Sequence, residues 1–142
     1  MRFVSLFSLL TGGMFLFSPI STLKAEEHGE HFMACAKICA ACQLDCDACH
    51  SHCLKLLAEG KKEHAKTVEA CVDCGDCCKL AATLSARNSP YAFAACECCA
   101  KCCDDCAAAC EKFPEDKHMA ECAKKCHECA KACREMLKHA KH

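Results

Sequence analysis

The chain has 142 residues, a length that fits a single domain. Eighteen lysines and arginines stand against 19 aspartates and glutamates, so the net charge is −1 and no basic patch marks a surface for nucleic acid or anionic lipid. With 21 cysteines, no tryptophan and one tyrosine, the composition excludes an ordinary apolar core, and cysteine must fill much of the interior.

The first 25 residues have the pattern of a secretory signal peptide. A basic start is followed by apolar residues 3–20 and by the small residue Ala25, after which charged residues begin. Polar residues, glycines and a proline interrupt the apolar stretch, which only approaches the about 20 residues that a membrane span needs. We therefore expect cleavage near Ala25 and an exported, periplasmic bacterial protein, with residues 1–25 as signal peptide, 26–142 as the folded domain and no membrane segment after cleavage.

Four helices are expected after this leader. The first covers about 30–59 and stops at Gly60, and the second covers about 61–86. The third begins with Ser89 as N-cap and Pro90 in the first turn and reaches about 112, and the fourth covers about 115–139. Because short connections favour antiparallel neighbours, the predicted fold is all-α, an antiparallel up-down-up-down four-helix bundle.

Eighteen of the 21 cysteines recur at intervals of three and four residues, on the helix face where a bundle normally carries leucine and isoleucine. This core stripe comprises Cys35, Cys39, Cys42, Cys46, Cys49, Cys53, Cys71, Cys74, Cys78, Cys96, Cys99, Cys103, Cys106, Cys110, Cys122, Cys126, Cys129 and Cys133. The remaining three are Cys77, Cys98 and Cys102, and the last two form a second row beside the stripe on the third helix. The pattern predicts a thiol-lined bundle axis, and we take all 21 cysteines as candidate metal ligands.

Two alternatives need no metal. Protonated cysteine is a small hydrophobe, so the stripe could be packing alone, although so many thiols would be prone to oxidation. Exported cysteines usually pair, so the chain could instead be a disulfide-stabilised helical scaffold for protein interactions. Geometry disfavours disulfides within a helix, because Cβ atoms three or four residues apart lie about 5–6 Å from each other and a disulfide needs about 3.8 Å.

Among metals, a continuous ladder of thiols favours Cu(I). Soft sulfur ligands select Cu(I), zinc or iron–sulfur clusters. Zinc prefers closed groups of four ligands, and the ladder has no obvious boundaries between such groups. Cu(I) accepts two or three thiolates, so multiple Cu(I) ions per chain are the expected cofactor.

Two short motifs favour a different class, an electron-transfer protein. The run Cys71-x-x-Cys74-x-x-Cys77 resembles the start of a ferredoxin motif, but its fourth cysteine and following proline are missing. Cys46-x-x-Cys49-His50 matches the c-type haem attachment motif, yet both of its cysteines also belong to the core stripe.

In these repeated cysteine spacings, the chain resembles the bacterial copper storage proteins, which are cysteine-rich four-helix-bundle copper-binding proteins. The resemblance covers nearly all of residues 26–142 through the Cys-x-x-x-Cys and Cys-x-x-Cys repeats on four helices. It implies non-enzymatic storage of many Cu(I) ions, often in a homo-oligomer, for copper homeostasis through supply to a copper-requiring enzyme or chaperone, or through detoxification. Exported members typically carry twin arginines, whereas only Arg2 is present here.

The two ends of the predicted bundle differ. One end gathers apolar residues such as Phe32 and Phe93 and is expected to be closed. The other gathers His64, His118 and Met119, which we expect to be outer ligands where copper enters, although they could equally be helix-start and core residues. No serine–histidine–aspartate set, carboxylate pair or phosphate loop points to catalysis.

Overall fold

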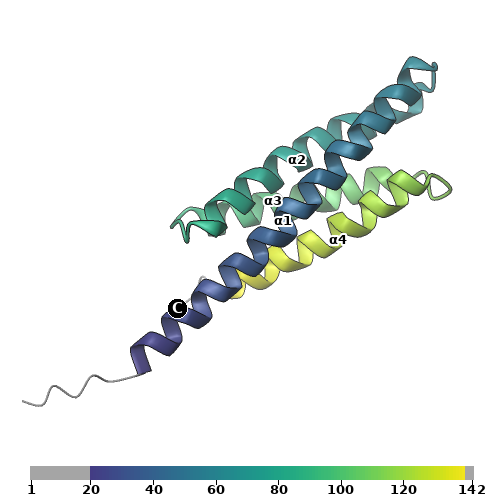
Figure 1. Cartoon of the computed structure of the whole chain (residues 1–142). Coiled ribbons are helices and arrows are strands. Elements are labelled where there is room, and N and C mark those ends of the chain that lie inside the picture. Colours follow the sequence, from purple (N-terminus) through teal and green to yellow (C-terminus); the bar gives the residue numbers. More distant parts are fainter. Residues whose placement is uncertain (1–19, 140–142) are drawn as a thin grey trace, which may run out of the picture.

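The structure is a computed structural model, and it describes the backbone of residues 20–139 and the side chains of residues 29–139. It contains helix α1 (Ile20–Ala58), the short 3-10 helix η1 (Lys62–His64), α2 (Ala65–Ala86), α3 (Ala92–Cys110) and α4 (Lys117–Lys138). Within this described part there are four long helices and no strands. The predicted all-α four-helix bundle is therefore confirmed at this level (Figure 1).

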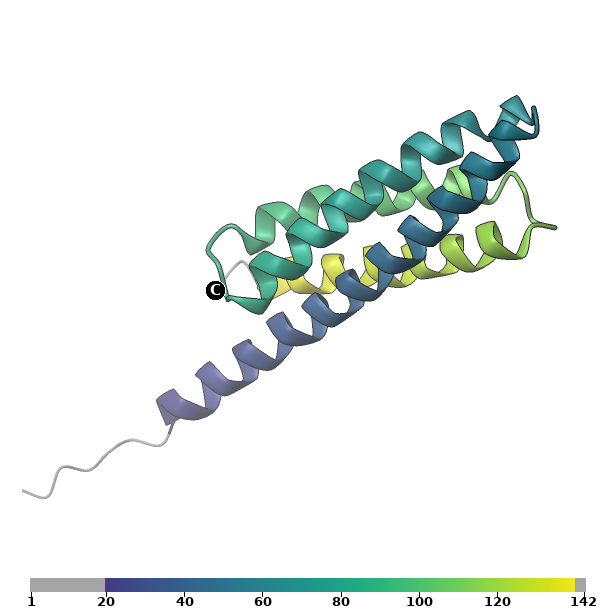
Figure 2. The same ribbon diagram turned by 45° about the horizontal axis from the view of Figure 1, so that its top comes forward.

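The four helices lie side by side, and their connections alternate between the two ends of the bundle. The turn after α1 and the turn before α4 lie at one end, and the turn between α2 and α3 lies at the other (Figure 1). The N-terminal turns of α1 extend beyond the other three helices (Figure 2).

Helix α1 begins earlier than expected. The sequence predicted a start near residue 30, whereas the backbone is helical from Ile20 and continues through the expected cleavage position at Ala25. Most of the predicted signal peptide, residues 1–19, lies outside the described residues, and its cleavage stays a prediction. Within the described part, no helix is both long and apolar enough to cross a membrane.

The ends of α1 and α2 are set by two residues in the left-handed backbone region. Gly60 has φ of 88°, and the N–H groups of Gly60 and Lys61 donate to the carbonyl oxygens of Leu57 (2.9 Å) and Leu56 (3.1 Å). Asn88, with φ of 49°, repeats the arrangement after α2. Both turns satisfy carbonyls that a helix end would leave unpaired, as in the Schellman motif. The predicted stop at Gly60 is confirmed by this geometry.

The starts of α3 and α4 differ in their capping. Ser89 Oγ accepts a hydrogen bond from the Tyr91 N–H at 3.3 Å, as a cap would, but regular α3 begins later than predicted, at Ala92. Asp116 is the N-cap of α4, and its carboxylate accepts from the N–H groups of His118 (3.0 Å) and Met119 (3.2 Å). The same carboxylate contacts His52 Nε2 of α1 at 2.6 Å, so the cap also ties α4 to α1.

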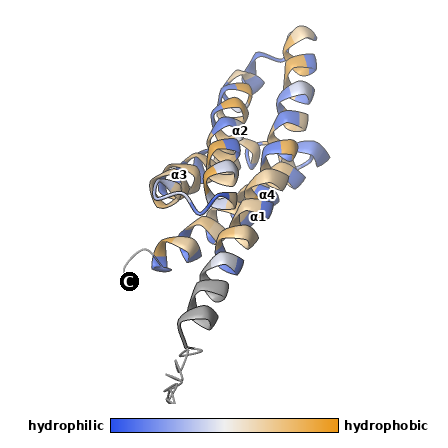
Figure 3. Cartoon of the chain, turned by 60° about the vertical axis from the view of Figure 1, so that its left-hand side comes forward, coloured by the Kyte–Doolittle hydropathy of each residue, from blue (hydrophilic) through white to orange (hydrophobic). Residues whose placement is uncertain are grey.

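Cysteine and alanine build the interior. Beside the cysteines, alanines such as Ala81, Ala92 and Ala107 are fully buried, while charged residues occupy the outer faces. Apolar and polar residues consequently alternate around each helix (Figure 3). At Gly75, α2 lies close to α1, because a Cβ built there would lie 3.3 Å from Asp47 Oδ1 and 3.7 Å from Cys46 Cβ.

The Asp116 cap yields a prediction about stability. We expect Asp116→Ala to lower the free energy of unfolding by about 1 kcal/mol, the typical value of an N-cap, whereas the exposed neighbour in Glu115→Ala should have little effect. Burial opposes ionisation of Asp116, but the hydrogen bonds from His52 and from the Met119 N–H together hold its pKa below the usual value.

A carboxylate with a lowered pKa stabilises the fold above its unfolded pKa of about 3.9 and loses that effect as pH falls through the lower folded value. The difference in unfolding midpoint between wild type and Asp116→Ala should therefore be constant near neutral pH and shrink in acid. Thermal or urea unfolding at several pH values measures this difference. Equal stability of the two proteins at pH 7 would contradict the assigned role.

Candidate metal centre

The eighteen cysteines of the core stripe all lie in the interior. Each exposes 4% of its surface or less, and Cys35, at one end, is the most exposed. They come from all four long helices, because the spacing of three and four residues keeps one face of each helix toward the axis. The sequence predicted that these side chains lie in the interior, and the structure places them there.

Their sulfur atoms form a continuous network along the bundle. Between helices, Sγ–Sγ distances are 3.7 Å from Cys35 to Cys96, 3.6 Å from Cys39 to Cys133 and 3.8 Å from Cys46 to Cys126. Farther along, Cys49 lies 3.9 Å from Cys110. All 21 cysteines are free thiols, and these distances far exceed the about 2.05 Å of a disulfide bond.

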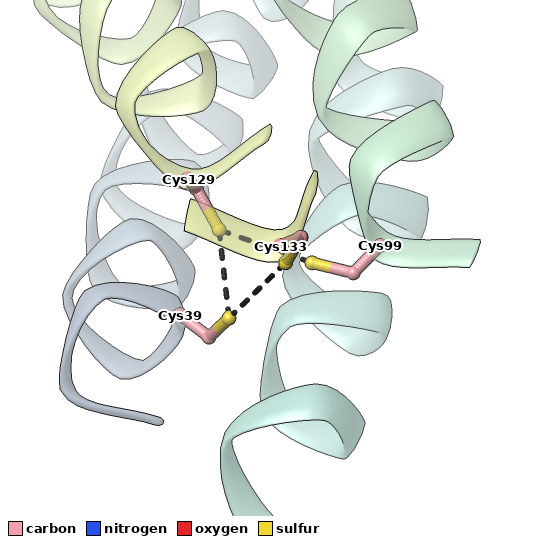
Figure 4. A group of neighbouring side chains, drawn as sticks. All are labelled: Cys39, Cys99, Cys129 and Cys133. Atoms are coloured by element: carbon pink, nitrogen blue, oxygen red, sulfur yellow. Dashed lines mark hydrogen bonds between the residues drawn. The ribbon is translucent and has the colours of Figure 1, made fainter. Parts of the chain in front are cut away.

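The network contains overlapping groups of four sulfurs, each group within 4.8 Å. In one of them Cys39 of α1, Cys99 of α3, and Cys129 and Cys133 of α4 point toward a common space (Figure 4). Neighbouring groups share members, which follows from the even spacing of the stripe. The group of Cys42, Cys74, Cys78 and Cys103 shares Cys42 and Cys74 with the group of Cys42, Cys46, Cys74 and Cys126. The group of Cys46, Cys106, Cys122 and Cys126 shares Cys122 with the group of Cys49, Cys71, Cys110 and Cys122.

The network also shifts the acidity of its thiols. Burial is the main cause that raises the pKa of Cys53 to about 12. The hydrogen bond with Cys103 is the main cause that lowers the pKa of Cys74 to about 7, and hydrogen bonds from Cys103 and Cys129 lower that of Cys99. A thiolate is favoured where neighbouring thiols donate to it, and those neighbours must then keep their protons. A metal cation removes this conflict because it balances the charge of adjacent thiolates.

Three predicted ligands lie apart from this network. Cys98 is exposed, and Cys77 and Cys102 are half-buried. They face each other on the outer side of α2 and α3, with Cys77 Sγ 3.1 Å from Cys102 Sγ and 3.6 Å from Cys98 Sγ. The sequence placed Cys98 and Cys102 in a second row beside the stripe, but not the proximity of Cys77 to them, which depends on how α2 and α3 align.

This separation bears on the electron-transfer alternatives. Cys71 and Cys74 face the core whereas Cys77 faces outward, so the ferredoxin-like run does not gather its cysteines around one space. Cys46 and Cys49 of the haem-like motif are both fully engaged in the interior, and His50 Nδ1 lies 3.3 Å from the Val68 carbonyl oxygen. The cysteines of the first motif therefore do not converge on one cluster site, and those of the second already belong to the core network.

The three predicted outer ligands are found in different surroundings at the end of the bundle near Gly60. His64 is buried, its ring centroid lies 4.2 Å from that of Phe113, and its Nδ1 has no hydrogen-bond partner. Met119 is fully buried. His118 is exposed and stacks on His52 at 4.4 Å between centroids.

His118 also lines a surface pocket of about 250 Å³ that reaches Cys49 and Cys122 of the core. The sequence analysis did not single out His52. Its contacts with His118 and Asp116 arise from the approach of α1 to the start of α4, which residue spacing cannot reveal.

Three solved structures with a similar fold are copper storage proteins. The Cu(I)-bound copper storage protein BsCsp3, from Bacillus subtilis, is 30% identical, with a TM-score of 0.69 over 75% of this chain and 98% of that one. A cytosolic copper storage protein from Streptomyces lividans, in a form with five coppers, is 27% identical, with a TM-score of 0.72 over 80% and 97%. A form from the same organism loaded with 10 copper equivalents is 28% identical, with a TM-score of 0.69 over 77% and 85%.

These structures correct one prediction. The expected export to the periplasm is wrong, because the Streptomyces lividans protein with this bundle is cytosolic. The export prediction depended on the apolar composition of a short N-terminal segment, which polar residues interrupt. Such an interrupted segment is a weak signal for export.

No curated protein matches the chain. A sequence model of the copper storage protein family matches residues 26–138, which include all 21 cysteines. Together with the copper-loaded structures, this match confirms the predicted storage of Cu(I) by many cysteines and the predicted cofactor, multiple Cu(I) ions. The chain belongs to the copper storage protein family.

Proposed function

We propose that the eighteen buried thiols of the core stripe are the storage ligands and that the protein is a reservoir of Cu(I) without catalytic activity. The observation that supports this most directly is the continuity of the sulfur network across all four helices. Each sulfur of the stripe lies within 4.8 Å of another, about the separation of two ligands of one metal ion. An ion can therefore bind between two helices without any large movement.

The overlap of the four-sulfur groups favours Cu(I) over zinc. Cys42 and Cys74 belong to two neighbouring groups at once, as do Cys46 and Cys126. A tetrahedral zinc ion in one group would take ligands from the next, whereas Cu(I) needs only two or three thiolates. The whole stripe can thus be filled with Cu(I) but not with tetrahedral zinc.

The proposal includes the place where copper enters, the end of the bundle near Gly60. The buried, unpartnered Nδ1 of His64 supports a ligand role, because a buried polar atom without a partner is costly unless something binds it. Met119 adds a soft thioether in the same region, and the pocket beside His118 leads to Cys49 and Cys122. The opposite end is filled by Phe32 against Phe93, whose centroids lie 5.5 Å apart.

Several finer features accompany this proposal. The storage domain comprises residues 26–142, and the helices follow an antiparallel up-down-up-down order, which the alternating connections support. Assembly into a homo-oligomer, and transfer to a copper-requiring enzyme or chaperone, would follow the pattern implied by the family resemblance.

Capacity tests the proposal. The reduced protein, titrated anaerobically with Cu(I) and analysed for bound metal, should bind more than about ten ions per chain, because eighteen thiolates can each bridge ions that need two or three. A zinc titration is the matched control and should saturate at far fewer ions. Saturation with one or two Cu(I) ions would contradict a storage role.

Loading should also depend on pH. Ligand thiols with a raised pKa, such as Cys53, are protonated near neutral pH, so Cu(I) that binds to them must displace protons. The affinity for Cu(I) should therefore rise with pH, up to about tenfold per pH unit for each proton released. Competition with a Cu(I) chelator at several pH values measures this slope, and proton release in weak buffer provides an independent check. A pH-independent affinity would show that the ligands are already ionised.

The entrance is tested by uptake kinetics. We expect His64→Gln and Met119→Leu to slow Cu(I) uptake about tenfold, equivalent to about 1.4 kcal/mol on the barrier, while final capacity stays nearly unchanged. His127→Gln is the matched control, because His127 lies on the outer face and contacts Glu111. Stopped-flow mixing with a Cu(I)–chelator complex follows the uptake. Equal rates in all variants would place the entrance elsewhere.

A further inference from the structure

From the outer cysteines we infer that Cys77, Cys98 and Cys102 form a second, solvent-accessible metal site that binds one Cu(I) separately from the core. The inference uses the Cu(I)–thiolate chemistry of the proposed function, but its ligands and its test are independent of core loading. The sulfur of Cys77 on α2 contacts those of both Cys98 and Cys102 on α3.

The geometry suits a three-coordinate ion. Three thiolates at about 2.3 Å from one metal ion in a plane lie about 4 Å from one another. Cys77 Sγ is already 3.1 Å from Cys102 Sγ and 3.6 Å from Cys98 Sγ, while Cys98 and Cys102 are one turn apart on α3. Small rotations of the side chains would therefore bring all three into ligand positions.

Packing accounts for these residues only in part, because Cys77 and Cys102 pack against the edge of the core and Cys98 does not. Cys98 is exposed and Cys77 and Cys102 are half-buried, in contrast to the fully enclosed stripe. At such positions a cysteine contributes little burial, while its thiol remains open to oxidation. A disulfide could join Cys77 to Cys102, but it would leave Cys98 without a role, whereas Cu(I) uses all three sulfurs.

Access to the site is open. A groove of about 320 Å³ between α2 and α3 includes Cys102 in its lining, together with charged residues such as Asp73, Asp105 and Lys112. Cu(I) that binds here displaces the thiol protons into solvent and forms Cu–S bonds in their place. An ion at this position can exchange with dissolved thiols without passing through the core.

Extraction kinetics test the inference. The full chain, reduced and loaded anaerobically with Cu(I), is mixed with an excess of bathocuproine disulfonate, and the coloured chelator complex is followed. We expect a rapid phase of about one Cu(I) per chain from the open three-thiolate site, and a slow phase from the buried stripe. In the triple variant Cys77→Ser, Cys98→Ser, Cys102→Ser, the rapid phase should be lost and the slow phase unchanged.

Two further variants complete the design. Cys46→Ala, in the core, should reduce the slow phase and keep the rapid one. Cys98→Ser alone removes one exposed ligand without disturbing the interior, and it should weaken binding of the rapidly exchanging ion. Circular dichroism establishes that each variant remains helical.

A rapid phase that persists in the triple variant would overturn the inference. So would a Cys77–Cys102 disulfide in protein that is alkylated during anaerobic lysis. A rapid phase without any slow phase would instead refute the core proposal and leave the surface site standing.

Discussion

The close packing of thiol sulfurs, in positions where a helical bundle usually buries branched apolar side chains, is the interaction on which this structure depends. The same atoms fill the interior and supply the ligands, so packing and metal binding cannot be separated. Cysteine is compact, and alanine fills many of the remaining interior positions, so the helices approach closely. Gly75, beside Cys46 and Asp47, shows how little space is left between α1 and α2.

This arrangement also explains why neutral thiols tolerate the interior. A lone buried thiolate would lack a counter-charge, but weak hydrogen bonds between sulfurs distribute the protons among neighbours. The acidity of one thiol then depends on its neighbours, as with the lowered pKa of Cys99. Bound Cu(I) ions replace the protons that these thiols share and hold positive charge at fixed positions. The thiol network therefore becomes more ordered as it is loaded.

Much of the fold could be read from residue spacing. Intervals of three and four place Cys35 through Cys53 on one helix face, and a glycine in the left-handed region ends the first helix at Gly60. These signals depend only on residues close together in the chain, so they can be predicted from a single sequence. The partner of each sulfur is not local: the contact of Cys39 with Cys133 depends on how the turns set the height of each helix. The burial of His64 against Phe113 and the pairing of His52 with Asp116 have the same origin.

The scarcity of large apolar side chains in the interior has a consequence for how long the protein persists. Burial of cysteine and alanine removes less apolar surface from water than burial of leucine or phenylalanine, so the empty bundle gains less from the hydrophobic effect. Bound cargo stabilises the native state in proportion to the logarithm of its concentration over its dissociation constant. Empty chains therefore open more often, and proteases act on open chains. Turnover would remove vacant molecules first, so that the amount of protein in the cell follows the supply of the ion it carries.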